Sequence, residues 1–333
     1  MTGAIRTVPP LAVMLIALVA VAVGSSFMPL DRVIAALFGA GSRADGIILW
    51  NIRLPRVLLA ALAGAALGVA GMLLQRATRN PLAAPSILGI VDGAAVGVLI
   101  FFLLFSNDAN ALVVSVNWQP LAAAGGALVF AATVGILAYQ DAVSPMRLLL
   151  YGVAMAALAN AIVVLMIIAG PVFRASQALI WLAGSVHTAD WREVGILGMA
   201  WLAVLPVLAW IVRPLDQLRL DDESAVSTGL NVTRTRIAAL VLSVLMTAAA
   251  VSVVGGIGFV GLIAPHAARL LYGTRAAPQI LGAACLGAGM VIGADLLVRA
   301  AFQPLEVPAG AVTALIGAPY FVYLLIRQGR AYA

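Results

Sequence analysis

The sequence predicts an all-α polytopic membrane protein that crosses the bilayer about ten times and forms one domain over residues 1–333. Hydrophobic residues make up 64% of the chain and charged residues only 10%, with a mean hydropathy of +1.11. A soluble domain is about one quarter charged, so water cannot be the solvent for most of this surface. The apolar runs are continuous instead of alternating with polar residues, which favours helices over the strands of a transmembrane barrel.

Each predicted helix follows from an apolar run close to the roughly 20 residues that cross the hydrocarbon core. The first run, Leu11 to Leu30, exceeds the roughly 7–15 apolar residues of a signal peptide, so we expect a retained helix. The eighth span is short, rich in Gly, and holds His266 and Arg269. The predicted spans are 9–30, 57–75, 87–105, 119–139, 148–169, 194–212, 237–255, 257–272, 278–298 and 308–326.

Arginine placement predicts the orientation of these spans. Ten spans put both termini on one side, and an inside N-terminus places 12 of the 19 arginines on inner segments and 7 on outer ones. The positive-inside rule therefore favours cytoplasmic termini. The same placement of arginines on inner segments accounts for the net charge of +6. Nucleic-acid binding is not indicated, because the sequence has no basic run and no aromatic platform. The single Cys285 excludes an internal disulfide and a multi-cysteine metal site.

Residues 220–236, LDDESAVSTGLNVTRTR, interrupt the apolar sequence between the sixth and seventh spans. Asp221 or Asp222 can cap a short helix at its N-terminus, and Gly229 suits the left-handed position after its end, with Leu230 as the following apolar contact. A helix of about two turns is not stable alone in water, so it must pack on the membrane domain or on a partner. A solvated loop is the alternative interpretation.

Four longer stretches resemble one family of transporters. The segment RLPRVLLAALAGAALGVAGMLLQRATRNPLAAPSILGIVDGAAVG (53–97) is similar to the opening block of the FecCD-type permeases, which belong to ABC importers of ferric siderophores, haem and cobalamin. Three more segments match that family in the same order: GFVGLIAPHAARLLYG (258–273), GADLLVRA (293–300) and EVPAGAVTALIGAPYFVYLL (306–325). The resemblance covers nearly all of the chain after the first helix.

The resemblance implies a type II ABC importer permease fold that works as a dimer with an identical or paralogous copy in the inner membrane. Two ATP-binding subunits would bind on the cytoplasmic side and a periplasmic substrate-binding protein on the other. The chain lacks Lys and therefore any phosphate-binding loop, so ATP and Mg would belong to the partner ATPase and this chain would be no enzyme and hold no cofactor or metal. We expect a ferric siderophore as cargo, with haem or cobalamin as the alternative.

Individual residues take expected roles from this resemblance. The residues expected to couple the chain to the ATPase are Asp221, Asp222, Glu223, Ala225, Val226, Thr228 and Gly229. Those expected to dock the binding protein are Arg53, Arg56 and Arg299, for which lipid-facing helix ends are the alternative. The turn Ser144, Pro145 and Met146 is expected to form an inner gate. A short outer helix is expected within 171–192, where Arg174 is a candidate for attracting an anionic chelate.

The remaining polar residues within the spans have structural interpretations beside functional ones. Asp92 lies where the family usually has a small polar residue, and we favour a helix-packing group over a substrate or proton site. A lone His266 is poor metal-site chemistry, so a structural or gating role is favoured for it and Arg269. Asp295 is expected to pair with Arg299 four residues on, and Glu306 to cap the last helix.

Two other classes of protein remain as alternatives. An ion-coupled secondary transporter would use Asp92 and Asp295 as its coupling carboxylates. An intramembrane hydrolase would need a nucleophile and a base at membrane depth, for which two His residues without a G-x-S-G-type turn give little support. A requirement for a P-loop ATPase encoded alongside this chain would exclude the secondary transporter.

Overall fold

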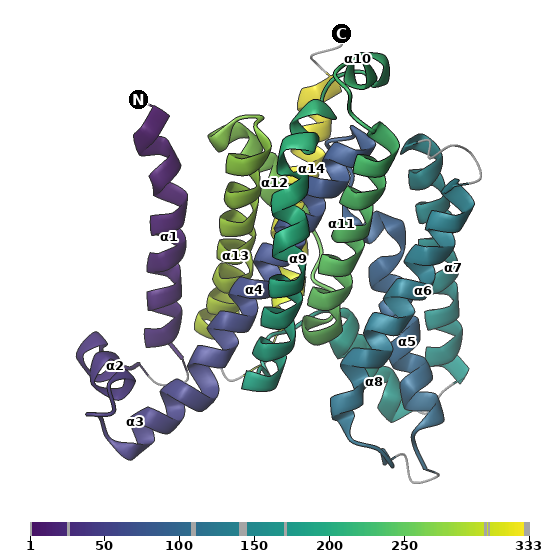
Figure 1. The fold of residues 1–333 in the computed structure, drawn as a ribbon. Helices are drawn as coiled ribbons and strands as arrows, with labels where there is room; N and C mark the ends of the chain where they lie inside the picture. Colours follow the sequence, from purple (N-terminus) through teal and green to yellow (C-terminus); the bar gives the residue numbers. More distant parts are fainter. Residues whose placement is uncertain are drawn as a thin grey trace.

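The computed structural model describes residues 2–24, 27–107, 111–139, 145–169, 172–302, 305 and 307–329, and these form a bundle of α-helices (Figure 1). Six helices are long and apolar enough to cross a membrane by length and composition, and shorter apolar helices lie among them. The helices that run through the bundle are α1 (Thr2–Ala22), α4 (Leu54–Thr78), α5 (Ile90–Leu104), α6 (Gln119–Tyr139), α7 (Pro145–Ala169), α9 (Trp191–Gln217), α11 (Val232–Val254), α12 (Val260–Tyr272), α13 (Ala276–Ala301) and α14 (Ala309–Gly329). About ten crossings, as the apolar runs predict, are confirmed.

Short helices occupy the two ends of the bundle. Helix α10 (Asp222–Ser227) lies at the end that also holds the beginning of α1, which we call the α10 end (Figure 1). Helices α2 (Leu30–Leu37), α3 (Arg43–Ile47) and α8 (Val172–Leu182) lie at the opposite, α8 end. The short helix expected within 171–192 is therefore present as α8, at the opposite end from residues 220–236.

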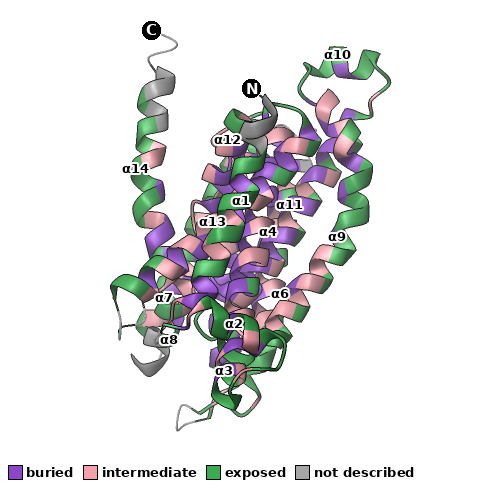
Figure 2. Cartoon of the chain, turned by 90° about the vertical axis from the view of Figure 1, so that its left-hand side faces the viewer, coloured by how far each residue is buried: buried purple, intermediate pink, exposed green. Residues whose placement is uncertain are grey.

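Helix α4 is the central element of the fold. It packs against α9, α11, α12 and α13, and most of its apolar length is buried. Figure 2 shows the buried residues concentrated in α4, α11 and α13, with exposed residues on the outer helices. A π-helical segment, Ile48–Arg53, joins α3 to α4, so this rod of helix begins well before the predicted start at residue 57.

Glycine allows α4 to approach its neighbours at backbone distance. A Cβ atom on Gly71 would lie 1.7 Å from the carbonyl oxygen of Gly261 in α12, and one on Gly68 would lie 2.2 Å from that of Ala283 in α13. Helix association in lipid depends on such van der Waals packing, since water does not drive the helices together there. The glycine content of the predicted second span is thus explained by its position at the centre of the bundle.

Helix α12 is shorter than a complete crossing. Its 13 residues rise about 20 Å at 1.5 Å per residue, less than the roughly 30 Å of hydrocarbon. The non-helical residues 255–259 precede it, and their backbone is bonded inside the protein: Gly256 N–H donates to Trp181 O at 3.3 Å. Non-helical backbone at membrane depth requires such internal partners, which explains why the short predicted span 257–272 is tolerated.

The predicted first span, 9–30, is wrong at both boundaries. Helix α1 begins at Thr2 and ends at Ala22, and an amphipathic helix, α2, starts at Leu30. An apolar run shows where a helix can lie but not where the chain turns, and here Leu30 belongs to the next element. The carbonyl groups at the C-terminal end of α1 accept hydrogen bonds from arginine side chains, which are described below.

Candidate functional site

Residues 220–236 fold at the α10 end as the sequence predicts. The Asp221 side chain accepts a hydrogen bond from the Ser224 N–H at 2.9 Å and caps α10. Gly229 adopts φ +83°, and Leu230 N–H donates to Ala225 O at 3.2 Å, which closes the helix in a Schellman arrangement. The hydrogen bond from Ser224 holds the pKa of Asp221 below its ordinary value, so this cap is charged at neutral pH.

The predicted coupling residues on α10 fall into two groups by their solvent exposure. Ala225 is fully buried and packs inward, so it fixes the position of the helix. Asp221, Glu223 and Thr228 are exposed, and Val226 is 60% exposed despite being apolar. An exposed, rigid turn with acidic and apolar side chains is suited to insertion into a cleft of another protein.

Asp222 ties α10 to the rest of the bundle. Its Oδ1 lies 2.6 Å from Nη2 of Arg79, the residue that ends α4, and 3.1 Å from Nη2 of Arg236 in α11. Arg79 adopts a left-handed φ of +51°, an uncommon conformation for a residue other than Gly, and also donates to Leu218 O at 3.0 Å and to Leu220 O. The central helix of the fold is thereby joined directly to the exposed α10.

Arg76, about one turn before Arg79 in α4, joins α4 to the end of α9 and to α13 through hydrogen bonds and an ion pair. Its guanidinium donates to Leu215 O at 2.9 Å and lies 3.2 Å from Asp216 Oδ1, both near the end of α9. It also donates to Gln279 Oε1 at 2.8 Å, in α13. These contacts could not be predicted from sequence, since they join residues 139–203 positions apart.

Of the three arginines predicted to dock a binding protein, Arg53 is buried and Arg56 and Arg299 are partly buried, all at the α8 end. Arg53 is only 3% exposed, and its Nη1 donates to Val21 O at 2.7 Å and Ala22 O at 2.8 Å. Arg299 donates to Val23 O at 2.7 Å and Ala20 O at 3.1 Å. These bonds satisfy the free carbonyl groups at the end of α1, which would be costly to leave unpaired in lipid.

Asp295 is the carboxylate at the centre of this group. It is 3% exposed and lies 2.6 Å from Arg56 Nη2 and 3.1 Å from Arg299 Nε, which confirms the expected i,i+4 pair and adds a partner from α4. Arg56 Nη1 also contacts His187 Nδ1 at 2.9 Å. We call Asp295, Arg53, Arg56 and Arg299 the Asp295 cluster. The contacts of these side chains lie inside the fold, and the docking role expected for the three arginines stays a prediction.

The other predicted residues are placed with less detail. Ser144 and Glu306 lie outside the described residues, Pro145 begins α7, and Met146 is 67% exposed. Arg174 lies in α8, and its side chain is outside the description. Asp92 is half-buried in the first turn of α5, where the free N–H groups of a helix favour an anion.

His266 is a packing residue in this structure. It is 7% exposed, and its ring lies edge-on to Tyr320 of α14 with the centroids 6.2 Å apart. Among the described residues, no group of three His, Cys, Asp or Glu side chains is placed to hold a metal ion. The contact joins α12 to α14, which accords with a structural or gating position.

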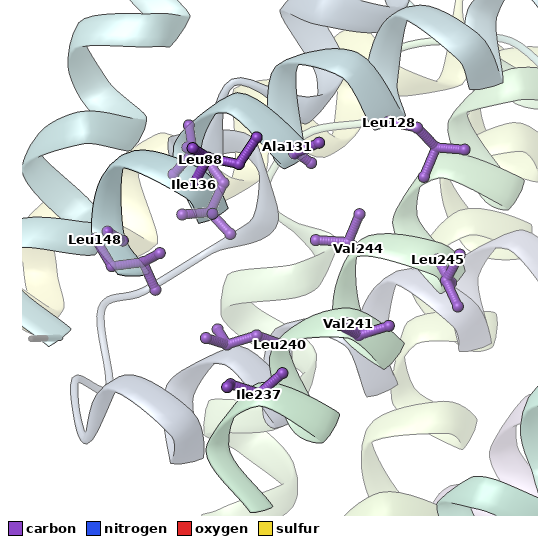
Figure 3. A pocket seen from close by; sticks show the side chains of 14 residues that line it. Leu88, Leu128, Ala131, Ile136, Leu148, Ile237, Leu240, Val241, Val244 and Leu245 are labelled. Carbon is purple, nitrogen blue, oxygen red and sulfur yellow. The ribbon is translucent and has the colours of Figure 1, made fainter. Parts of the chain in front are cut away.

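A cavity of about 670 Å³ between α6 and α11 is lined by aliphatic side chains (Figure 3). Leu128 and Ile136 of α6 face Ile237 and Val241 of α11 across it. The described residues that line it carry no side chain that could coordinate a metal or bind a carboxylate, so this lining suits an apolar occupant.

Comparison with known proteins gives one consistent family. The model of the FecCD transport family matches residues 12–327. The achromobactin transport system permease protein CbrC of Dickeya dadantii is 42% identical, covering 96% of this chain and 90% of its own length. The Fe(3+)-citrate import system permease protein YfmE of Bacillus subtilis is 37% identical over 96% of this chain and 94% of its own. A solved structure described as an inward-facing, metal-chelate type ABC transporter is 26% identical and superposes with a TM-score of 0.85, covering 97% of this chain and 99% of the other.

Proposed function

The chain belongs to the FecCD transport family, and on that premise we propose that it is the translocating permease of an ABC importer for a ferric siderophore. The observation that carries the proposal is the match of nearly the whole chain to permeases named for iron chelates. Other relatives of 34–39% identity are named for hydroxamate, enterobactin and dicitrate complexes of iron, again as permeases. A relative of uptake systems for several unlike chelates is expected to recognise its cargo weakly.

In the proposed assembly the α10 end faces the cytoplasm and the α8 end the periplasm. This orientation agrees with the arginine bias, and it places the capped α10 where two ATP-binding subunits would bind. Those subunits would supply ATP hydrolysis with Mg, since this chain has no Lys for a phosphate loop. The permease itself breaks no bond in the cargo.

We place the ATPase contact on the exposed face of α10, formed by Asp221, Glu223, Val226 and Thr228. ATP-driven closure of the ATPase subunits would displace α10, and the contacts of Asp222 would carry this displacement to α4 and α11. A short helix with both ends capped keeps its shape under load, which a solvated loop would not. The exposed Glu223 and Asp221 suit a partner cleft that carries positive charge.

The translocation path is proposed to lie between two permease copies, identical or paralogous. Helix α14 supports this because it stands at the edge of the bundle (Figure 2) and exposes Leu315 by 74% and Ile316 by 57%. Helix α7 similarly exposes Leu165 and Ile168, and Met146 lies at its inner end, in the predicted gate. An apolar path without charged ligands would let the chelate pass without trapping it.

Docking of the periplasmic binding protein is assigned to arginines that remain exposed at the α8 end. These are Arg32, with 54% of its side chain exposed, Arg43 and Arg192. Exposed ion pairs contribute only about 0–1 kcal/mol each, so they would govern the rate and register of docking more than its strength. The Asp295 cluster would hold the helices beneath this surface in place.

Uptake of radiolabelled iron in a strain lacking this gene tests the proposal. We expect loss of one class of iron chelate among hydroxamates, catecholates and carboxylates, with haem and cobalamin uptake unchanged. The wild-type gene should restore uptake, and Asp221→Arg/Glu223→Arg should not, at equal abundance in the membrane. Loss confined to haem or cobalamin would instead assign the chain to the other cargoes of the family.

A further inference from the structure

A second cavity at the α10 end concentrates positive charge. Its volume is about 290 Å³, and four arginines line it: Arg76 of α4, Arg79 directly after α4, Arg219 after α9, and Arg269 of α12. No acidic side chain is among the described residues that line it. These arginines come from three separate parts of the chain, so the fold, and not local sequence, brings them together.

Only two of the four positive charges have a counter-charge. Arg76 pairs with Asp216 and Arg79 with Asp222, whereas the side chains of Arg219 and Arg269 form no hydrogen bond or ion pair with any residue that the structure describes. The cavity therefore carries two uncompensated charges next to two compensated ones. The positive-inside rule explains arginines at this end of the protein, but not their convergence on one pocket.

The neutral lining of the cavity is fixed in place. Gln279 accepts from Arg76 through Oε1 at 2.8 Å and donates from Nε2 to Pro265 O at 3.4 Å. Gln75 donates to Leu262 O at 3.4 Å, and Arg76 is only 8% exposed. The rigid wall leaves the unpaired Arg219 and Arg269 as the groups free to bind an anion.

Exposed apolar side chains occur at the same end of α12 and α13 as the pocket. Leu270, in the last turn of α12, and Leu281, in the second turn of α13, are each 66% exposed. A small soluble anion would make no favourable contact with apolar side chains, whereas a phospholipid presents a phosphate and acyl chains together. The cytoplasmic leaflet also carries the anionic lipids that attract basic groups near a membrane surface.

We propose that this cavity binds the phosphate of an anionic phospholipid from the cytoplasmic leaflet, with Arg219 and Arg269 as its ligands. The acyl chains would lie along Leu270 and Leu281. The assignment depends on the proposed orientation of the α10 end but not on the cargo or on ATP-driven transport. The bound lipid would neutralise the charge between the ends of α4, α9 and α12, next to the residues that hold α10.

Native mass spectrometry of the purified, delipidated transporter complex tests this proposal. Titration with phosphatidylglycerol should give tighter binding than titration with phosphatidylcholine. Because each basic residue contributes about 1 kcal/mol to binding of an anionic lipid, Arg219→Ala/Arg269→Ala should weaken phosphatidylglycerol binding by roughly 20- to 30-fold. The matched control Arg213→Ala/Arg275→Ala removes two exposed arginines of the same end that do not line the cavity, and it should leave the affinity unchanged.

Several results would overturn the assignment. Equal affinity for the two lipids, or unchanged phosphatidylglycerol affinity in the Arg219→Ala/Arg269→Ala variant, would show that the cavity does not bind the anionic headgroup selectively. Displacement of the lipid by inorganic phosphate at equal concentration would identify a soluble anion as the ligand. If the Arg219→Ala/Arg269→Ala variant loses the ATPase subunit while its lipid affinity is unchanged, the two arginines bind a carboxylate of that subunit and not a lipid. If the double variant does not stay monodisperse, Arg219→Gln alone should still weaken binding by roughly fivefold.

Discussion

Replacing Asp295 by alanine is expected to destabilise the folded permease by about 3–5 kcal/mol. The substitution leaves Arg56 and Arg299, whose side chains are 11% and 10% exposed, without the carboxylate that both of them contact. Arg299 also holds the end of α1, so loss of its position would expose the carbonyl groups that it satisfies. The midpoint of thermal aggregation of the purified complex, followed by size-exclusion chromatography, measures the effect.

Asp45 provides the matched control for Asp295. It pairs with Arg32 at the same end of the protein, but the Arg32 side chain is 54% exposed, so Asp45→Ala should cost no more than about 1 kcal/mol. Asp295→Glu keeps the charge and should recover part of the stability. An Asp295→Ala variant as stable as the Asp45→Ala variant would show that the Asp295 cluster does not hold the fold together.

Replacing Asp222 by alanine is expected to uncouple transport from ATP hydrolysis while leaving the fold intact. Asp222 is 52% exposed, so its ion pairs contribute little to stability, at most about 1 kcal/mol each. They are nevertheless ion pairs that join α10 to the residue after α4 and to α11. Substitutions along such a connection change coupling by about 0.5–2 kcal/mol, which corresponds to roughly a 2- to 30-fold fall in chelate transported per ATP.

The ratio of uptake to ATP hydrolysis in proteoliposomes measures this effect. The cap of α10 by Asp221 is retained in Asp222→Ala, so the ATPase subunit should still bind and hydrolyse ATP. Asp222→Glu restores a carboxylate and should recover coupling. Ser227→Ala, an exposed change on the same helix whose hydroxyl bonds only to Ser224 O, should leave the ratio unchanged. An unaltered ratio in Asp222→Ala would mean that α10 acts through other contacts.

The helices and the capped segment 220–236 were predictable because their signals are local. The predicted fourth span, 119–139, coincides with α6, and the Asp and Gly residues around α10 act within one turn of the positions that they cap. The i,i+4 pair of Asp295 and Arg299 is local in the same sense. Such features depend only on the regular geometry of a helix and on residues close to one another in the sequence.

The contacts of Arg53, Arg56 and Arg299 inside the fold were not predictable, because they depend on partners far away in the chain. Arg53 bonds to carbonyl groups 31 and 32 residues earlier, at a helix end that the apolar run placed too late. Arg56 and Asp295 are 239 residues apart. An arginine at the end of an apolar run looks the same in sequence whether it faces water or caps another helix, and only the packing of α1 against α13 decides between them.

The most direct test of the account is transport by the purified components. The permease, its ATPase and its binding protein would be reconstituted in proteoliposomes with a radiolabelled ferric siderophore. We expect accumulation of the chelate that requires ATP and the loaded binding protein and that persists when a protonophore abolishes the proton gradient. Uptake that follows the proton gradient in the absence of ATP would contradict the account and identify the chain as a secondary transporter.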